Sequence, residues 1–311
     1  KHVTIPDNVT TIKENAFGGY GSLLQITIPS SVNEIGPNAF YGCQSLKQVT
    51  ILSKPTKIES QMFFKCESLT EIEIPSSVAF IDSYAFCGCK SLNTIIIPSS
   101  VTEIGRNAFY GCSSLTNLSL HDNLTRIGQK CFYGCRNLNK VLIPSFLAEI
   151  EASSFCLCSS LEEIIIQSSI GVKIGDEAFK GCKALKKIEI PDNVEEIGQC
   201  SFKDCVNLEE IRMNPYKTKI QNDSFNDCCS LKHFIFDENI NILKKYNHKQ
   251  IGSINKITLP SKTTIIESSS FQNFSTLKEI NIPSTVTEIG SNSFNGCSSL
   301  IEIIISSSVR S

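Results

Sequence analysis

Apolar residues return along the chain at a fixed interval. Phenylalanine recurs at twelve positions: Phe17, Phe40, Phe63, Phe86, Phe109, Phe132, Phe155, Phe179, Phe202, Phe225, Phe271 and Phe294. Successive phenylalanines are 23 residues apart, except that Phe179 follows after 24 and Phe271 after 46. The 46-residue interval is two periods, with His248 where a phenylalanine is expected. The chain therefore contains thirteen copies of one unit, and such periodicity is typical of a repeat array.

Further apolar positions keep the same phase within each unit. Five residues before the phenylalanine stands isoleucine or, once, Leu243, and six residues after it stands leucine or, once, Ile254. Nine and eleven residues after the phenylalanine the side chain is apolar in every unit, with mostly polar neighbours. This alternation predicts a strand with one buried face. Proline follows the strand in seven units and ends it, because proline has no N–H to donate.

The residues around the phenylalanine predict tight turns. Two residues after it, seven units have glycine and three have Asp204, Asp227 or Asn273, which are residue types that tolerate a positive φ. The remaining three units have Lys65, Leu157 and Gln250 there, so we expect local distortion in them. The segment before the phenylalanine, such as Ile104–Phe109, is too short for a stable helix and predicts a turn or a short 3₁₀ piece.

One such unit cannot bury its own apolar side, but stacked units can. We therefore expect a single β-rich solenoid over residues 1–311, with parallel strands about 4.8 Å apart and a phenylalanine spine, forming a rod or shallow arc roughly 60 Å long. A degenerate unit is expected at about residues 237–260. Neither end shows a polar capping unit, which predicts an array truncated or uncapped at both ends and open to end-to-end self-association.

The repeat resembles a known family. The pattern L-x-x-I-x-I-P-x-x-V-x-x-I-G-x-x-A-F-x-G-C stands almost unaltered at 92–112 and 277–297, and it resembles the BspA-like, or Treponema pallidum-type, leucine-rich repeat. The resemblance implies a right-handed leucine-rich solenoid with parallel strands on one face and turns or short 3₁₀ pieces on the other. It implies surface antigens and adhesins of oral bacteria and mucosal protists, which bind host or matrix proteins and have no catalytic residues.

Three features qualify the resemblance. Cysteine as the regular residue after the glycine is more similar to the protist members than to the bacterial ones. The unit around His248 departs from the pattern, since it loses phenylalanine, glycine and cysteine together and has Ile251 at the cysteine position. In the first unit Tyr20 takes the cysteine's place.

Ten of the fifteen cysteines share one position, three residues after the phenylalanine. They are Cys43, Cys66, Cys89, Cys112, Cys135, Cys158, Cys182, Cys205, Cys228 and Cys297. Ile251 and Phe274 replace cysteine elsewhere, which favours a column of buried free thiols acting as small hydrophobic groups. Disulfides are the less favoured alternative, because side chains pointing in parallel do not meet in the required geometry.

The other five cysteines do not predict a metal site. They are Cys87, Cys131, Cys156, Cys200 and Cys229. Cys87 and Cys156 each form a C-x-C pair with a column cysteine, but the pairs lie three units, or about 14 Å, apart. That separation is too large for one zinc ion, so we expect no metal and no cofactor.

Composition excludes several classes of function. The net charge is −2 and the pI about 6.2, which gives no attraction to nucleic acid or to an anionic membrane. No apolar stretch approaches the ~18 residues that cross a bilayer, so we expect no membrane insertion by this segment. The four histidines fall at different phases of the repeat, no nucleotide-binding or nucleophile motif occurs, and adjacent carboxylates such as Glu162 and Glu163 are expected to be solvated. We therefore predict that the chain is not an enzyme.

A partner is expected on the outward side of the strands. Those positions lie eight and ten residues after the phenylalanine, and in a solenoid they form one continuous surface. The candidate binding residues are Lys140, Leu142, Glu163, Ile165, Lys187, Glu189, Glu210 and Arg212. An apolar centre at Leu142 and Ile165 with a charged rim is typical of protein interfaces. The alternative is that an ordinary β-rich surface simply tolerates isolated aliphatic residues.

These observations predict a non-catalytic protein-binding chain. On the resemblance it is a surface antigen or adhesin, at the cell surface or secreted, that attaches to a host or matrix protein. The alternative is a cytoplasmic scaffold or regulatory subunit with an intracellular protein partner, which the many thiols favour because thiols are usual in reducing compartments. Glycan recognition would require exposed aromatic residues on the strand face, and that face has none.

Overall fold

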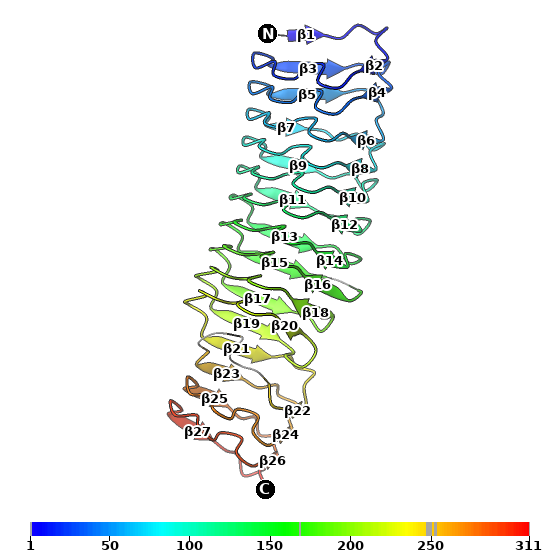
Figure 1. The fold of residues 1–311 in the computed structure, drawn as a ribbon. Helices are drawn as coiled ribbons and strands as arrows, with labels where there is room; N and C mark the ends of the chain where they lie inside the picture. The colour runs from blue at the N-terminus through cyan, green and yellow to red at the C-terminus, as the bar shows by residue number, and fades with distance from the viewer. Residues whose placement is uncertain (1, 168, 247–250, 252–253, 311) are drawn as a thin grey trace.

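A computed structural model shows the chain as a rod of stacked coils with the two termini at opposite ends (Figure 1). The structure describes residues 2–167, 169–246, 251 and 254–310, and these contain two columns of short parallel strands and no α-helix. The major strand column consists of β1 (His2–Thr4), β3 (Gln25–Ile28), β5 (Gln48–Ile51), β7 (Glu71–Ile72), β9 (Thr94–Ile96), β11 (Asn117–Ser119), β13 (Lys140–Ile143), β15 (Glu163–Ile166), β17 (Lys187–Ile190), β19 (Glu210–Met213), β21 (His233–Phe236), β23 (Lys256–Thr258), β25 (Glu279–Asn281) and β27 (Glu302–Ile304).

The minor strand column ends at the isoleucine that precedes each phenylalanine. It consists of β2 (Thr11–Ile12), β4 (Glu34–Ile35), β6 (Lys57–Ile58), β8 (Phe80–Ile81), β10 (Glu103–Ile104), β12 (Arg126–Ile127), β14 (Glu149–Ile150), β16 (Val172–Ile174), β18 (Val194–Ile197), β20 (Lys219–Ile220), β22 (Ile242–Leu243), β24 (Ile265–Ile266) and β26 (Glu288–Ile289). The sequence did not predict this second column as strand. Two residues are too few for an alternating pattern to be visible.

The repeat period sets the pairing of the strands. Within each sheet a strand pairs in parallel with the equivalent strand one coil further on, as Ile26 does with Val49, and buried and exposed residues alternate along it. Among the described residues the major column is divided into separate sheets between β7 and β9, β11 and β13, and β15 and β17. Where the coil has 24 residues the partners are also 24 apart, as for Glu149 and Lys173. Any other register would turn the apolar positions toward solvent. The predicted β-solenoid of about thirteen parallel coils is confirmed.

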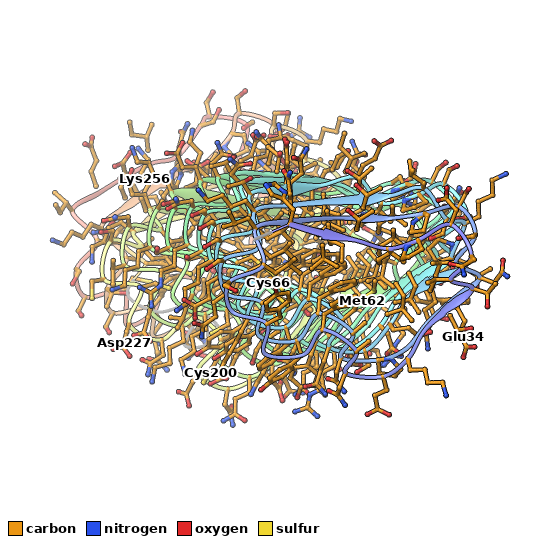
Figure 2. The ribbon with its side chains drawn as sticks, turned by 90° about the horizontal axis from the view of Figure 1, so that it is seen from above. Glu34, Met62, Cys66, Cys200, Asp227 and Lys256 are labelled. Carbon is orange, nitrogen blue, oxygen red and sulfur yellow. The ribbon has the colours of Figure 1, made fainter. Side chains whose placement is uncertain are left out.

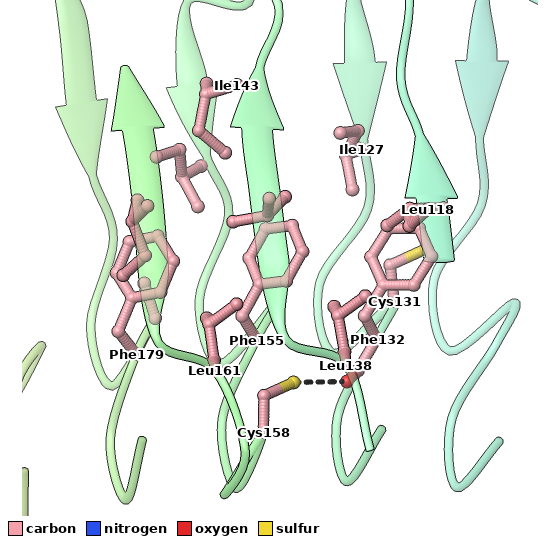
Figure 3. Packing of buried hydrophobic residues seen from close by; sticks show 14 of the residues in the cluster. Leu118, Ile127, Cys131, Phe132, Leu138, Ile143, Phe155, Cys158, Leu161 and Phe179 are labelled. Carbon is pink, nitrogen blue, oxygen red and sulfur yellow. Dashed lines mark hydrogen bonds between the residues drawn. The ribbon is translucent and has the colours of Figure 1, made fainter. Parts of the chain in front are cut away.

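A stack of phenylalanine rings forms the centre of the core (Figure 3). Neighbouring ring centroids lie 5.2–5.6 Å apart from Phe17 to Phe225, with nearly parallel planes. Of the predicted core residues, six are completely buried: Phe40, Phe86, Phe109, Phe132, Phe179 and Phe202. The seventh, Phe294, is half-buried and packs against the same core. Its ring stacks on Phe271 at 5.4 Å, and no spine ring follows it in the given sequence.

The corners predicted from glycine, aspartate and asparagine are left-handed as expected, with Gly111 at φ +70°. The predicted distortion at Lys65 and Leu157 is wrong, because both adopt the same left-handed conformation at φ +55° and +60°. Gln250 lies outside the described residues. A second left-handed column, two residues before the phenylalanine, was not predicted at all. It contains Asn15, Asn38, Gln61, Tyr84, Asn107, Lys130, Ser153, Glu177, Cys200, Asp223, Ser269 and Asn292.

Hydrogen bonds between coils explain why such different residues accept this strained backbone. In one coil the amides of Asn107, Phe109 and Gly111 donate to carbonyls of the next coil at 2.8–3.0 Å. The turn side is therefore a third inter-coil ladder, made of turns rather than of strand or 3₁₀ helix. Each left-handed residue costs about 1–2 kcal/mol, which these backbone bonds offset whatever the side chain is.

The irregular coil replaces the missing phenylalanine with other rings. His248, where the pattern expects phenylalanine, lies outside the described residues. Tyr246 packs edge-on against Phe236 at 5.3 Å and Phe271 at 6.4 Å, and burial raises the pKa of Tyr246. The Tyr216 hydroxyl accepts a bond from the Lys244 amide and donates to the Lys244 carbonyl, both at 2.7 Å. Aromatic packing thus continues from one regular part of the array to the other.

Candidate functional site

The strand face is the surface formed by the outward residues of the major strand column. Viewed along the array, Met62 and Cys66 lie inside the coils, whereas Glu34, Asp227 and Lys256 lie at the periphery (Figure 2). The eight candidate residues all lie on the strand face, on β13, β15, β17 and β19. Lys140 is paired with Glu163 and Leu142 with Ile165, while Glu189 is paired with Arg212. The structure therefore brings the predicted residues together in one patch.

The prediction that this patch has an exposed apolar centre is wrong. Leu142 and Ile165 are half-buried rather than exposed. Lys140 Nζ lies 2.8 Å from Glu163 Oε2, so these two rim charges already form an ion pair. Exposed ion pairs contribute about 0–1 kcal/mol, so a partner could replace this one at small cost.

The charge ladder continues beyond the predicted patch. Glu210 Oε2 lies 3.2 Å from His233 Nδ1, and Lys256 Nζ lies 2.9 Å from Glu279 Oε1. His233 Nε2 is also within 2.8 Å of the Thr258 hydroxyl. Lys140 and Lys256 thus each have a carboxylate one coil away, and Glu210 contacts the His233 ring.

A groove on the strand face was missed by the sequence analysis. It has a volume of about 1100 Å³ and crosses β5, β7 and β9. Its walls include Leu52 and Ile96, which are 56% and 78% exposed, and the exposed carboxylates Glu71 and Glu73. This groove lies outside the patch that the sequence predicted. The available signals were leucine at a proline position in Leu52 and isoleucine at an outward position in Ile96.

Partly exposed aromatic residues form stacked pairs on the turn side. One residue after the spine, Tyr41 stacks on Phe64 at 5.0 Å and Tyr110 stacks on Tyr133 at 4.8 Å, with almost parallel rings. Tyr41 and Tyr110 are each 37% exposed. In each pair the two rings cover one face of each other.

The cysteine column does more than fill space. All ten column thiols donate to the carbonyl oxygen of the phenylalanine in the preceding coil, at 3.1–3.4 Å, as Cys158 does to Phe132 (Figure 3). Eight of the ten are buried, while Cys228 and Cys297 are half-buried, and all fifteen cysteines are free. Burial raises the pKa of the Cys43 thiol to about 11. The predicted column of free thiols is confirmed, and its role is structural.

The described residues present rows of side chains on the surface and no cluster suited to a metal ion. Within them, no three histidine, cysteine, aspartate or glutamate side chains converge in a way that could hold a metal ion. The same part of the chain has no helix with the length and hydrophobicity to cross a bilayer. What the strand face can do chemically is present rows of side chains at fixed spacing to another molecule.

These stacked coils, with parallel strands and buried leucine and phenylalanine columns, define a leucine-rich repeat solenoid. The family model described as BspA type leucine rich repeat region (6 copies) matches residues 1–113, 56–172, 171–250 and 242–311. The chain belongs to the BspA-type leucine-rich repeat family. Leucine-rich repeat proteins of this kind are typically non-enzymatic scaffolds that bind other proteins.

Solved structures agree with this assignment. A leucine-rich repeat protein from Bacteroides ovatus is 30% identical with a TM-score of 0.73, and the match covers 96% of this chain and 85% of that one. A leucine rich cell surface protein from Faecalibacterium prausnitzii is also 30% identical, with a TM-score of 0.60 and coverages of 96% and 86%. The pneumococcal vaccine antigen PcpA, 24% identical with a TM-score of 0.52 and coverages of 93% and 84%, shares the fold. None of the curated proteins matches the chain.

Proposed function

We propose that this chain is the recognition part of a surface antigen or adhesin that attaches to a host or matrix protein through the strand face. The observation that supports the surface role is the similarity to the Faecalibacterium protein, whose name gives it as a cell surface protein and which matches nearly the whole chain. Binding without catalysis fits the repeat class and the solvent-facing rows of side chains.

The size of the strand face suits a protein partner. Thirteen coils about 4.8 Å apart give a face roughly 60 Å long, and strands of three or four residues make it roughly 12 Å wide. That area of roughly 700 Å² approaches the ~800 Å² that each partner buries in an ordinary protein complex. The face is rigid, because every outward side chain alternates with a buried one in the core, so little conformational entropy is lost on binding.

One observation favours a second candidate, a cytoplasmic scaffold or regulatory subunit. All fifteen cysteines are free, and Cys229 is exposed, which is more usual in a reducing compartment. Both candidates use the same face and differ in location and partner.

Two experiments test the proposal. Labelling intact source cells with a membrane-impermeant biotin reagent should label this protein if it is at the surface, and an unlabelled protein beside a labelled surface marker favours the scaffold. A pull-down with the charge reversals Glu163→Lys, Lys187→Glu and Arg212→Glu tests the predicted patch. Lys173→Glu, on the minor strand column, is the matched control. Binding that ignores all three reversals contradicts the patch.

A further inference from the structure

The groove across β5, β7 and β9 differs from the rest of the strand face in its charge. Glu71 is paired across the sheet with Gln48, and the equivalent position one coil further on is Thr94. Glu73 stands between the neutral residues Thr50 and Ile96. Among the described residues, no ion pair joins either glutamate to a cation, whereas Glu163 and Glu279 elsewhere on the strand face are paired with Lys140 and Lys256.

Two exposed apolar side chains flank these carboxylates. Ile96 lies on the C-terminal side of the acidic pair, and Leu52 lies at the end of β5 on the other side. Both side chains are more than half exposed and line the groove. A partner that enters the groove can therefore bury their apolar area. Among the described residues that line the groove, Lys54, which follows β5, is the one cation beside these two glutamates.

We propose that this groove binds a short extended segment of a protein partner, with a lysine or arginine opposite Glu71 and Glu73 and aliphatic side chains against Leu52 and Ile96. The inference rests on the proposed function and names the chemistry of the partner. The groove crosses three strands about 4.8 Å apart, a span of about 10 Å, which about three residues of extended chain cover. Charge complementarity selects the basic residue, and the apolar walls select its neighbours.

The test uses the whole 311-residue chain and a displayed library of random peptides about 12 residues long. Recovered peptides should contain lysine or arginine beside aliphatic residues. Measured by fluorescence anisotropy, their Kd should rise about tenfold for Glu71→Gln combined with Glu73→Gln, and by a similar factor for Ile96→Ser. Affinity should also fall as NaCl is raised from about 50 to about 500 mM, because the contact is electrostatic.

Controls separate this inference from the proposed function. Glu279→Gln, an exposed strand-face substitution far from the groove, should leave the peptide Kd unchanged, and circular dichroism melting should show every variant folded. The inference fails if no peptide is recovered, if recovered peptides lack basic residues, or if the groove variants bind as well as wild type. A partner captured by the whole chain whose binding depends on Glu163, Lys187 and Arg212 instead would keep the proposed function and refute the groove.

Discussion

Removing one ring from the phenylalanine spine tests the stacked core directly. Phe109 is completely buried and lies 5.2 Å from the Phe86 ring and 5.3 Å from the Phe132 ring. Phe109→Ala leaves a cavity that three neighbouring coils line, and we expect a loss of about 3–5 kcal/mol in the free energy of unfolding. With an unfolding entropy of about 2.1 cal/mol/K per residue, a loss of ~4 kcal/mol lowers Tm by about 6 °C if the whole array unfolds together.

The assay is urea and thermal unfolding followed by circular dichroism. A repeat array can unfold in parts, so a split transition in the variant is also expected, since the weakened coil interrupts coupling between neighbours. Phe294→Ala is the matched control. Its ring is half-buried and has one stacking partner, so it should cost only about 1–2 kcal/mol. A Tm for Phe109→Ala within about 1 °C of wild type, or equal losses for the two variants, would refute the stacked-core explanation.

Four further predictions concern the turns, the thiols and the surface charges. Gly111→Ala should lower the free energy of unfolding by about 1–2 kcal/mol, because its φ is +70°. Gly105→Ala should lower it by about 3 kcal/mol, because the added Cβ would lie 2.6 Å from a backbone nitrogen of the preceding coil. Equal urea midpoints for the two variants would contradict this. In native protein a thiol-specific reagent should modify Cys229 at once and at most four cysteines in all, and rapid reaction of all fifteen would show that the column is open. Lys140→Ala should change stability by less than about 1 kcal/mol, and a larger drop would mean that the Lys140–Glu163 pair is structural. Burial raises the pKa of most of the thiols, three of them to about 11, so the unfolded chain loses these protons first and the free energy of unfolding should fall as the pH rises above about 9. A triple alanine variant at these three thiols should make that fall shallower, and an unchanged slope would count against the explanation. The three thiols are Cys43, Cys87 and Cys156.

The left-handed residues before the spine could not be predicted from the sequence, because backbone hydrogen bonds rather than side chains determine their conformation. The left-handed residues before the spine include Tyr84, Lys130 and Glu177, which share no property that predicts a positive φ. Inter-coil amide bonds impose the conformation, and such bonds depend on no side chain. For the same reason Lys65 takes the corner conformation that glycine takes elsewhere.

The candidate site could be placed but not described from sequence. Alternation correctly assigned Lys140 and Glu163 to an outward surface, but it treated every outward residue as equally exposed. Exposure of Leu142 depends on neighbouring coils, and the groove beside Ile96 depends on three strands at once. Neither property is present in any single unit.

By itself, the sequence determined the period, the buried columns, the parallel register and the family. The same apolar positions recur in thirteen units, and only one register of the strands buries all of them. The tertiary structure decided which further turn residues are left-handed, which carbonyl accepts a hydrogen bond from each column thiol, and where the strand face has a groove. Those properties arise between coils, from hydrogen bonds and packing that join residues 23 positions apart, and no single repeat contains them.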